Sequence, residues 1–280
     1  MIYERAQMAG QRSDSPEYLA RKAQFADLLT VYGRKTVLDA LENSGVCVVK
    51  LHMAETASGA VIDRMLQLAA KRGITVNRTS HERVTRISKN GRQDQGVAAD
   101  IRTGGYESAE EYFLRSPAQC VFAALDGVTT PENVGMVIRS VAAAGLDGVI
   151  LPSKGCCGVN PLVIKASAGT VFRTRILRTE TLEGALEAAR GAGATVCALE
   201  ASGAVELPAF RPPERVIYVL GGESAGISEP VRRFIRQSIR IPMHNGVESL
   251  NVAVAASLVA FHHAFHAKGN ASAVKPASLA

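Results

Sequence analysis

Asn133, Gly135 and Arg139 form the first of three segments whose residue types could do chemistry. They follow an apolar run at 120–125, and the helical period of 3.6 residues would put Asn133 and Arg139 about 60° apart on one helix face. Gly135, in the first turn of that helix, would let a ligand or another chain approach closely. The segment could therefore orient a bound substrate, although a capped helix with a surface arginine has the same pattern.

The second segment places one acid among three glycines. Glu223 lies between Gly221-Gly222 and Gly226, directly after the apolar run 216–220. Glycines allow backbone amides and carbonyls to face a ligand, so this turn could hold a small molecule. It matches neither the Gly-Lys-Ser/Thr phosphate loop nor the G-x-G-x-x-G dinucleotide loop, and a plain tight turn is the alternative.

The third segment runs from Ile241-Pro242-Met243 to Ser249-Leu250-Asn251. We predict Ser249 as the N-cap of the last helix, which would put Leu250 and Asn251 in its first turn. Asn251 is unusual on an otherwise apolar helix. It is either functional or a buried asparagine bonded to a backbone carbonyl.

The composition restricts the class of protein. The chain has 280 residues, 47% of them hydrophobic, which is typical of a globular protein with two domains or one large one. Its apolar runs are too short for a membrane span, and its polar N-terminal residues do not resemble a signal peptide. With only 5 cysteines we expect a reducing, cytoplasmic location and no disulfide framework.

The charge balance permits a nucleic-acid partner without requiring one. There are 32 Lys+Arg against 26 Asp+Glu, a formal net charge of +6, shared by both halves of the chain. The densest basic stretch comprises Lys71, Arg72, Arg78, Arg83, Arg86, Lys89 and Arg92. Such a cluster suits phosphate contacts, whereas a solvated surface is the alternative. The absence of Trp makes an aromatic platform for stacking bases unexpected.

The pattern of apolar runs predicts an α/β fold. In the first part, helices at 36–41 and 62–70 alternate with strands at 46–51, 74–76 and 96–101. In the second part, the expected strands are 120–125, 148–151, 195–199, 216–220 and 238–241, and the expected helices are 132–144 and 249–266. This part would be an open sheet with helices on both faces, a fold that binds ligands beyond the carboxyl ends of its strands.

The same pattern divides the chain into five stretches. They are an N-terminal extension at 1–30, a small domain at 31–102, a linker at 103–118, a large domain at 119–267 and a flexible tail at 268–280. The linker is polar and begins near Gly104-Gly105, which is typical of a connection between domains. An ordinary long loop inside one domain is the alternative.

In order and spacing, the three segments resemble the signature motifs of the SpoU/TrmH family of RNA ribose 2′-O-methyltransferases, in the SPOUT superfamily. The family patterns Asn-x-Gly-x-x-x-Arg, Gly-x-Glu-x-x-Gly and Ile-Pro-Met…Ser-Leu-Asn-Val are matched at 133–139, 221–226 and 241–252. The likeness covers about 120–266. The stretch from Tyr32-Gly33-Arg34 to Gly96-Val97-Ala98 is similar, less closely, to the small RNA-binding domain that precedes the catalytic domain in many members.

The resemblance implies a C-terminal domain tied in a trefoil knot that binds S-adenosylmethionine, and a homodimer in which the first motif's arginine reaches the partner subunit's site. The implied cofactor pocket comprises Leu199, Gly221, Gly222, Glu223, Ile241, Pro242, Met243, Ser249 and Leu250. The implied RNA contacts are Arg34, Lys71, Arg72, Arg83, Arg86 and Arg139. No metal is implied. Glycine-rich backbone and apolar walls suit a bound adenine.

The implied reaction is methyl transfer to a ribose 2′-hydroxyl of RNA, with rRNA favoured because of the two-domain layout. The implied catalytic residues are Arg139, Asn133, Glu223, Asn251 and Ser249. Because a guanidinium has a pKa above about 12, Arg139 suits a cation that binds the adjacent phosphate and stabilises oxyanion charge better than it suits a base. Asn133 and Glu223 would orient Arg139 and the ribose, while Ser249 and Asn251 support the substrate.

Alternative functions are a tRNA ribose methyltransferase, a relative that methylates a base nitrogen, and a non-catalytic RNA-binding or ribosome-assembly protein with a vestigial cofactor pocket. An NAD-dependent oxidoreductase lacks its fingerprint loop here. His244, His262, His263 and His266 lack zinc-ligand spacing and are expected on the surface or in packing. We expect Cys156-Cys157 to be loop thiols and Ser167-Ala168-Gly169-Thr170 to be a structural turn.

Overall fold

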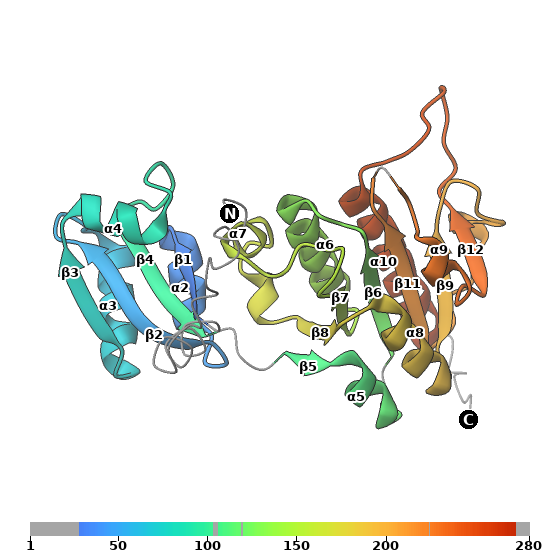
Figure 1. Cartoon of the computed structure of the whole chain (residues 1–280), viewed down its shortest axis with the longest axis horizontal. Helices are drawn as coiled ribbons and strands as arrows, with labels where there is room; N and C mark the ends of the chain where they lie inside the picture. Colours follow the sequence, from blue (N-terminus) through green and yellow to red (C-terminus); the bar gives the residue numbers. More distant parts are fainter. Residues whose placement is uncertain (1–27, 103–105, 119, 224, 273–280) are drawn as a thin grey trace, which may run out of the picture.

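Two α/β units lie next to each other along the long axis of the molecule (Figure 1). The structure, a computed structural model, describes residues 28–102, 106–118, 120–223 and 225–272. The smaller unit has a four-stranded sheet in the order β1-β4-β2-β3, and the larger an eight-stranded sheet in the order β10-β12-β9-β11-β6-β7-β8-β5. The predicted α/β class, with a small unit before a large one, is confirmed.

The small unit places the start of each helix at one edge of its sheet. Its elements are β1 (Leu28–Tyr32), α2 (Arg34–Glu42), β2 (Cys47–Ala54), α3 (Ala60–Lys71), β3 (Thr75–Thr79), α4 (His81–Ser88) and β4 (Val97–Arg102). Strands β1, β2 and β3 run in one direction and β4 in the other. The carboxyl ends of β1, β2 and β3 therefore meet at one edge, which we call the carboxyl edge of the small sheet.

The large unit is a parallel sheet covered by helices. Its elements are β5 (Glu107–Ser108), α5 (Ala109–Leu114), β6 (Val121–Asp126), α6 (Pro131–Ala144), β7 (Gly148–Pro152), α7 (Pro161–Ala166), η1 (Thr170–Phe172), β8 (Arg175–Thr179), α8 (Leu182–Gly191), β9 (Thr195–Leu199), β10 (Val205–Glu206), η2 (Leu207–Ala209), β11 (Val216–Gly221), α9 (Glu229–Arg232), β12 (Gln237–Arg240) and α10 (Val252–Ser272). Every neighbouring pair of its strands is parallel.

Alternate side chains of the central strands build a core on each face of the large sheet. From β11, Tyr218 points into the core formed with α6, α7 and α10, whereas Ile217 points into the core formed with α5, α8 and α9. β6 does the same with Ala123 and Phe122. Because successive strand residues face opposite ways, a strand buried on both faces has an uninterrupted apolar run. That run is what identified both strands in the sequence.

Three of the predicted boundaries differ from the structure. The small sheet begins at Leu28, inside the predicted extension 1–30, because β1 pairs with β4 along its whole length. Most of the predicted linker 103–118 belongs to the large unit, since β5 pairs with β8 and α5 buries Phe113 in the large core. Helix α10 continues to Ser272, into the predicted tail 268–280, and the rest of that tail lies outside the described residues.

Some elements had no clear sequence signal. Helix α4 buries only Val84 and Ser88, so its apolar period is too sparse to recognise. Strand β8 carries Arg175 and Arg178 among its five residues, and these two arginines interrupt the apolar pattern of its buried residues Ile176 and Leu177. Both are held in place by neighbours that are distant in sequence.

Candidate active site

A cavity opens at the carboxyl ends of β9, β11 and β12, where the second and third sequence segments meet. Its volume is about 810 Å³. The residues lining it include all nine that were predicted for a cofactor pocket: Leu199, Gly221, Gly222, Glu223, Ile241, Pro242, Met243, Ser249 and Leu250. The sequence-predicted pocket residues, which span 52 positions from 199 to 250, therefore share one space.

The three segments are joined by a network of side-chain amides around one carboxylate. Asn133 Nδ2 donates to Glu223 Oε1 at 2.9 Å, and Asn251 Nδ2 donates to the same oxygen at 2.9 Å. Asn251 Nδ2 also donates to Asn133 Oδ1 at 3.0 Å. Hydrogen bonds to an ionised acceptor are stronger than neutral ones, so this network fixes the start of α6 and α10 relative to the Glu223 turn.

Asn251, and not Ser249, caps helix α10. The Asn251 Oδ1 accepts from the backbone N–H of Ala253 at 2.9 Å, and the helix begins at Val252. The predicted N-cap at Ser249 is wrong because Ser249 and Leu250 remain in the loop that lines the cavity. A single asparagine side chain thus uses its oxygen on the helix and its nitrogen on the network. A buried asparagine bonded only to a backbone carbonyl is not what the structure contains.

Close backbone contacts hold the glycine turn against the loop after β6. A Cβ at Gly222 would lie 2.5 Å from Gly127 O, and a Cβ at Gly221 would collide with the backbone of Gly226. Asp126 Oδ2 accepts from the Ser228 N–H at 2.7 Å, which closes the far end of the same turn. Asp126 was given no role from the sequence. The sequence feature that could have identified it is its position as the polar residue that ends an apolar strand.

Charged residues at the far wall of the cavity form two ion pairs that the sequence analysis missed. Arg232 donates to Glu200 at 2.8 Å and Arg240 donates to Glu206 at 2.8 Å. All four line the cavity. The hydrogen bond that Arg232 donates to Glu200 raises the pKa of Arg232 above its ordinary value. Glu200 directly follows β9, and Arg240 is the last residue of β12. A charged residue at the carboxyl end of a predicted strand is the sequence feature that could have identified both.

Arg139 lies apart from this cavity. It is exposed on α6, two turns after Asn133, and is not among the residues that line the cavity. Among the described residues it has no hydrogen bond or ion pair to a side chain of its own chain. The next residue, Ser140, bonds to Ser257 of α10 at 2.7 Å, so this part of α6 is held against α10.

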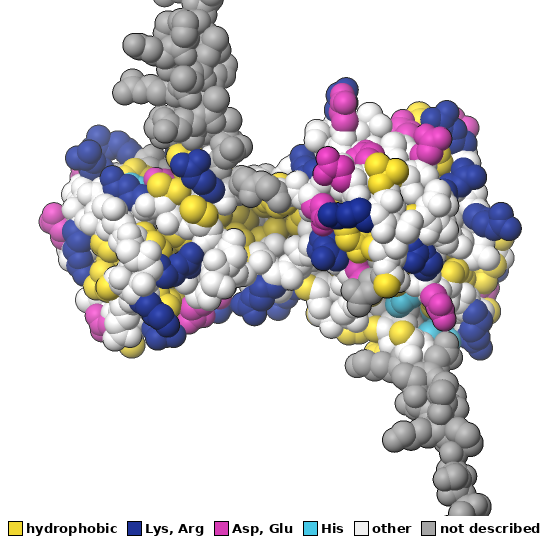
Figure 2. Space-filling view, turned by 90° about the horizontal axis from the view of Figure 1, so that it is seen from below, with side chains coloured by type: hydrophobic (Ala, Val, Ile, Leu, Met, Phe, Trp, Pro, Cys, Tyr) yellow, Lys and Arg dark blue, Asp and Glu magenta, His cyan; other side chains and the backbone are white. Residues whose placement is uncertain are grey.

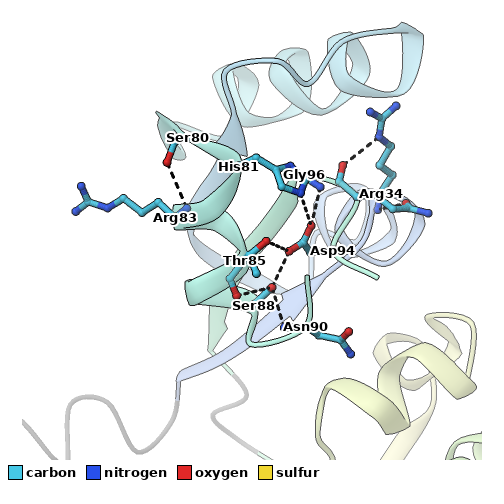
Figure 3. A network of polar contacts seen from close by, with 10 residues as sticks. Arg34, Ser80, His81, Arg83, Thr85, Ser88, Asn90, Asp94 and Gly96 are labelled. Atoms are coloured by element: carbon cyan, nitrogen blue, oxygen red, sulfur yellow. Dashed lines mark hydrogen bonds and ion pairs between the residues drawn. The ribbon is translucent and has the colours of Figure 1, made fainter. Parts of the chain in front are cut away.

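The predicted RNA contacts do not share one surface. Arg34 lies at the carboxyl edge of the small sheet, where it donates to Gln95 O and Ser58 O. Arg83 and Arg86 are exposed on α4, which starts at the same edge, while Lys71 is exposed at the opposite end of α3. Figure 3 shows Arg34 and Arg83 projecting from either side of a central polar network.

Arg72, which was predicted as an RNA contact, is bonded to the backbone of the small unit. Its guanidinium donates to the carbonyls of Leu41 at 2.7 Å and Asn43 at 3.1 Å, and also to those of Ala40 and Val46. These carbonyls lie at and just beyond the end of α2, where a helix has no partners of its own for them. The side chain is therefore engaged inside the small unit, where it holds the end of α2.

A buried carboxylate supports the carboxyl edge of the small sheet. Asp94 is fully buried and accepts from Thr85 Oγ1 at 3.0 Å, Ser88 Oγ at 2.9 Å and the Gly96 N–H at 2.9 Å (Figure 3). His81 Nε2 lies 3.9 Å from Asp94 Oδ1. Several donors compensate for the cost of burying this charge. The network ties α4 to the loop before β4, next to Arg34.

The histidines of α10 take part in packing. His262 bonds to the Phe210 carbonyl at 2.9 Å, and His263 Nδ1 lies 2.9 Å from the Tyr218 hydroxyl. Burial lowers the pKa of His263 and raises the pKa of Tyr218. No group of three or more metal-ligating side chains occurs within the described part of the chain. Over the same residues, no helix is long and apolar enough to cross a membrane.

Comparison with known proteins gives the same division of the chain. Residues 121–261 match the SpoU rRNA Methylase family, and residues 30–106 match the domain described as RNA 2′-O ribose methyltransferase substrate binding. A relative from Mycolicibacterium vanbaalenii, named an uncharacterized tRNA/rRNA methyltransferase, is 32% identical over 243 residues. These cover 85% of this chain and 77% of the relative.

Solved structures share the fold. The SpoU methyltransferase AviRb from Streptomyces viridochromogenes, in complex with AdoMet, is 20% identical with a TM-score of 0.74 over 89% of this chain and 93% of that one. An AdoMet-bound rRNA methyltransferase from Sinorhizobium meliloti is 24% identical with a TM-score of 0.73 over 88% and 90%. The motif network, the cavity and the family match agree. The chain belongs to the SpoU rRNA methylase family.

Proposed function

We propose that this protein transfers a methyl group from S-adenosylmethionine to a ribose 2′-hydroxyl of RNA, with rRNA as the favoured substrate. The observation that carries the proposal is the Asn133–Glu223–Asn251 network at the cavity. It joins three separate motifs into one site. The substrate-binding match of the small unit supports RNA as the substrate class.

The cavity fits S-adenosylmethionine. A volume of about 810 Å³ lies within the range of small-molecule pockets. Leu199, Ile241 and Leu250 offer apolar walls for adenine, and the Gly221-Gly222 turn offers backbone groups for its polar edge. When bound, the cofactor supplies an activated methyl group on a sulfonium centre.

The residues of the chain would then position the acceptor and stabilise its charge. Glu223, fixed by two amide donors, is placed to orient the ribose, with Ser249 and Asn251 on the substrate side. Methyl transfer to a hydroxyl develops negative charge on the attacking oxygen, and a fixed cation at that point lowers the barrier. Arg139 provides this cation and binds the neighbouring phosphate, since a guanidinium stays protonated.

In a homodimer, Arg139 would reach the cavity of the partner subunit. Helix α10 exposes a stripe of apolar side chains, with Val254 48%, Leu258 42%, Phe261 37% and Phe265 68% exposed. Their spacing of four, three and four residues puts them on one helix face. Because α10 packs on α6, a second copy that covers this stripe would also meet the exposed Arg139. The trefoil knot implied by the family stays a prediction, as does the cytoplasmic location.

RNA would lie against both units. Arg34, Arg83 and Arg86 are placed to contact phosphates at the carboxyl edge of the small sheet, and Lys71 could add a contact at its far side. The positive charge is spread over both units on the face shown in Figure 2, rather than gathered in one tail. Recognition through backbone contacts and RNA shape suits this distribution.

The test is transfer of a labelled methyl group from S-adenosylmethionine to purified rRNA and, separately, to tRNA. Digestion to nucleosides followed by mass spectrometry distinguishes a 2′-O-methyl product from a methylated base. We expect 2′-O-methylation of rRNA. The tRNA/rRNA name of the relative makes tRNA the second candidate substrate. A methylated base would overturn the ribose assignment, and cofactor binding without transfer to either RNA would favour a non-catalytic role.

A further inference from the structure

The turn after α7 is held by hydrogen bonds between its own residues. Ser167 Oγ donates to the Ile164 carbonyl at 2.8 Å, and Thr170 Oγ1 donates to the Ser167 carbonyl at 2.8 Å. Within it, Gly169 has a φ of +75°, in the left-handed region that side chains other than glycine disfavour. We call residues 167–172 the docking turn, for the contacts described next.

The docking turn and its neighbour α7 contact the small unit at three points. Asn43 Nδ2, at the end of α2, donates to the Phe172 carbonyl at 2.8 Å. Lys165 Nζ, on α7, donates to Gln93 Oε1 at 2.7 Å. Between these two bonds, the side chain of Asp39 lies on the open face of Gly169: a Cβ at position 169 would be 2.7 Å from Asp39 Oδ2.

Asp39 is a buried carboxylate with one oxygen that lacks a hydrogen-bond partner among the described atoms. Its side chain is 2% exposed, and Oδ1 accepts from Lys35 Nζ at 2.7 Å. The Oδ2 atom is buried and has no hydrogen-bond partner among the described atoms. An unpaired carboxylate oxygen is costly to bury, so packing of α2 against the docking turn, rather than polar bonding of Asp39, must keep it there.

Apolar contacts continue across the same junction. Val31 and Val37 of the small unit belong to one hydrophobic cluster with Val163, Ile164 and Val171 of the large unit. Figure 2 shows hydrophobic side chains at this junction. Domains joined only by a small polar interface move freely, whereas a shared apolar cluster favours a fixed arrangement.

The docking turn is also packed against the helix that carries Asn133 and Arg139. A Cβ at Gly135 of α6 would lie 2.5 Å from Ala166 Cβ and 2.9 Å from the Ser167 N. No side chain separates α6 from the end of α7. Contacts therefore run from α6, which carries Asn133, through the end of α7 and the docking turn to the Asp39 side chain of α2.

We propose that the docking turn is the surface on which the chain's own small unit is seated, and that Gly169 and Asp39 are positioning residues. They fix where the carboxyl edge of the small sheet lies relative to the cavity. The consequence for RNA rests on the proposed function, whereas the seating itself does not.

The test compares Gly169→Ala with Gly193→Ala in the full chain. Both glycines are left-handed, with φ of +75° and +83°, so alanine strains the backbone equally. Only at 169 does the new Cβ meet the small unit, because the nearest heavy atom at Gly193 is 3.8 Å away. The variant Gly169→Ala/Asp39→Ala then removes the Asp39 carboxylate, whose Oδ2 would lie 2.7 Å from the new Cβ, and leaves only the Cβ of residue 39, at 3.0 Å.

Amide hydrogen exchange at residues 37–43 and 170–173 reports the seating without any substrate. We expect exchange there to rise about tenfold in Gly169→Ala, to stay within about twofold of wild type in Gly193→Ala, and to fall back most of the way towards wild type in the double variant. Asn43→Ala removes the bond to the Phe172 carbonyl and the bond that Asn43 Oδ1 accepts from the Gly45 N–H, but adds no clash, so it should give a smaller rise at the same segments. Equal exchange in the 169 and 193 variants, or no recovery in the double variant, would overturn the proposal.

Methylation kinetics report the consequence. We expect Gly169→Ala to raise KM for RNA several-fold with little change in kcat or in cofactor affinity, and the double variant to restore KM in part. A fall in kcat with unchanged KM would overturn the positioning role. If wild type methylates no RNA while the exchange result holds, the proposed function fails and the seating stands.

Discussion

Arg139 is the residue on which the chemistry of the proposed reaction depends most. It is exposed, and it lies outside the cavity of its own chain. We predict that Arg139→Ala leaves the affinity for S-adenosylmethionine unchanged, measured by calorimetric titration, and lowers kcat for RNA methylation about 10²-fold or more, because the cation at the developing oxyanion is lost. Arg139→Lys should recover part of the rate.

The control for this substitution is Arg236→Ala. Arg236 is exposed just before β12, at the end of that strand away from the cavity. Its removal takes away the same charge without touching the site. A loss of activity in the control equal to that of Arg139→Ala would assign the effect to overall charge. Weakened cofactor binding in Arg139→Ala would contradict a role confined to the acceptor.

At the scale of elements, the end of α2 depends on a single guanidinium. We predict that Arg72→Ala lowers the free energy of unfolding of the small unit by about 2–3 kcal/mol, because several carbonyls lose a charged donor. Lys71→Ala, one residue earlier and exposed, should change it by less than about 0.5 kcal/mol. Urea denaturation followed by circular dichroism measures both.

For RNA binding we predict the reverse order: Lys71→Ala should have an effect, and Arg72→Ala should have none. Below the unfolding transition of Arg72→Ala, its RNA affinity should match wild type. Lys71→Ala should reduce the slope of log affinity against log salt by up to about 1, if its ammonium contacts a phosphate. An unchanged slope would remove Lys71 from the interface and leave the carboxyl edge, with Arg34 and Arg83, as the basic surface of the small unit.

At the scale of the whole molecule, the apolar stripe of α10 decides whether two chains associate. We predict that Phe265→Glu, at a residue 68% exposed, shifts the protein from dimer to monomer in light scattering and abolishes methylation. Leu114→Glu is the matched control, since Leu114 is an exposed apolar residue at the end of α5, 78% exposed, on the face of the large sheet opposite α10. A monomeric wild-type protein with full activity would refute the homodimer.

Mixing two inactive variants tests whether Arg139 acts on the partner subunit. If it does, dimers of Arg139→Ala with Glu223→Ala contain one intact site. Random exchange of subunits in an equal mixture should then restore about a quarter of wild-type activity. If Arg139 acts within its own chain, the mixture stays inactive.

The sequence determined the residues of the site and the strands that carry them. Asn133 and Glu223 were singled out in segments that follow apolar runs, Asn251 as a polar residue on an apolar helix, and the family motifs joined the three into one candidate site. Parallel strands bring their carboxyl ends to one edge, which is where such segments meet. The buried strands β6, β9 and β11 were predicted within a residue because burial on both faces leaves an uninterrupted apolar run. Residue type and local period contain that information.

Only the tertiary structure decided what similar residues do. Lys71 and Arg72 are adjacent and equally charged, yet one is solvated and the other is bound to the end of α2. Ser249 has the better local capping chemistry, yet Asn251 caps α10 because its amide is held by residues 28 and 118 positions away. These outcomes depend on contacts between distant segments, and the free energy of such contacts leaves no local pattern in the chain.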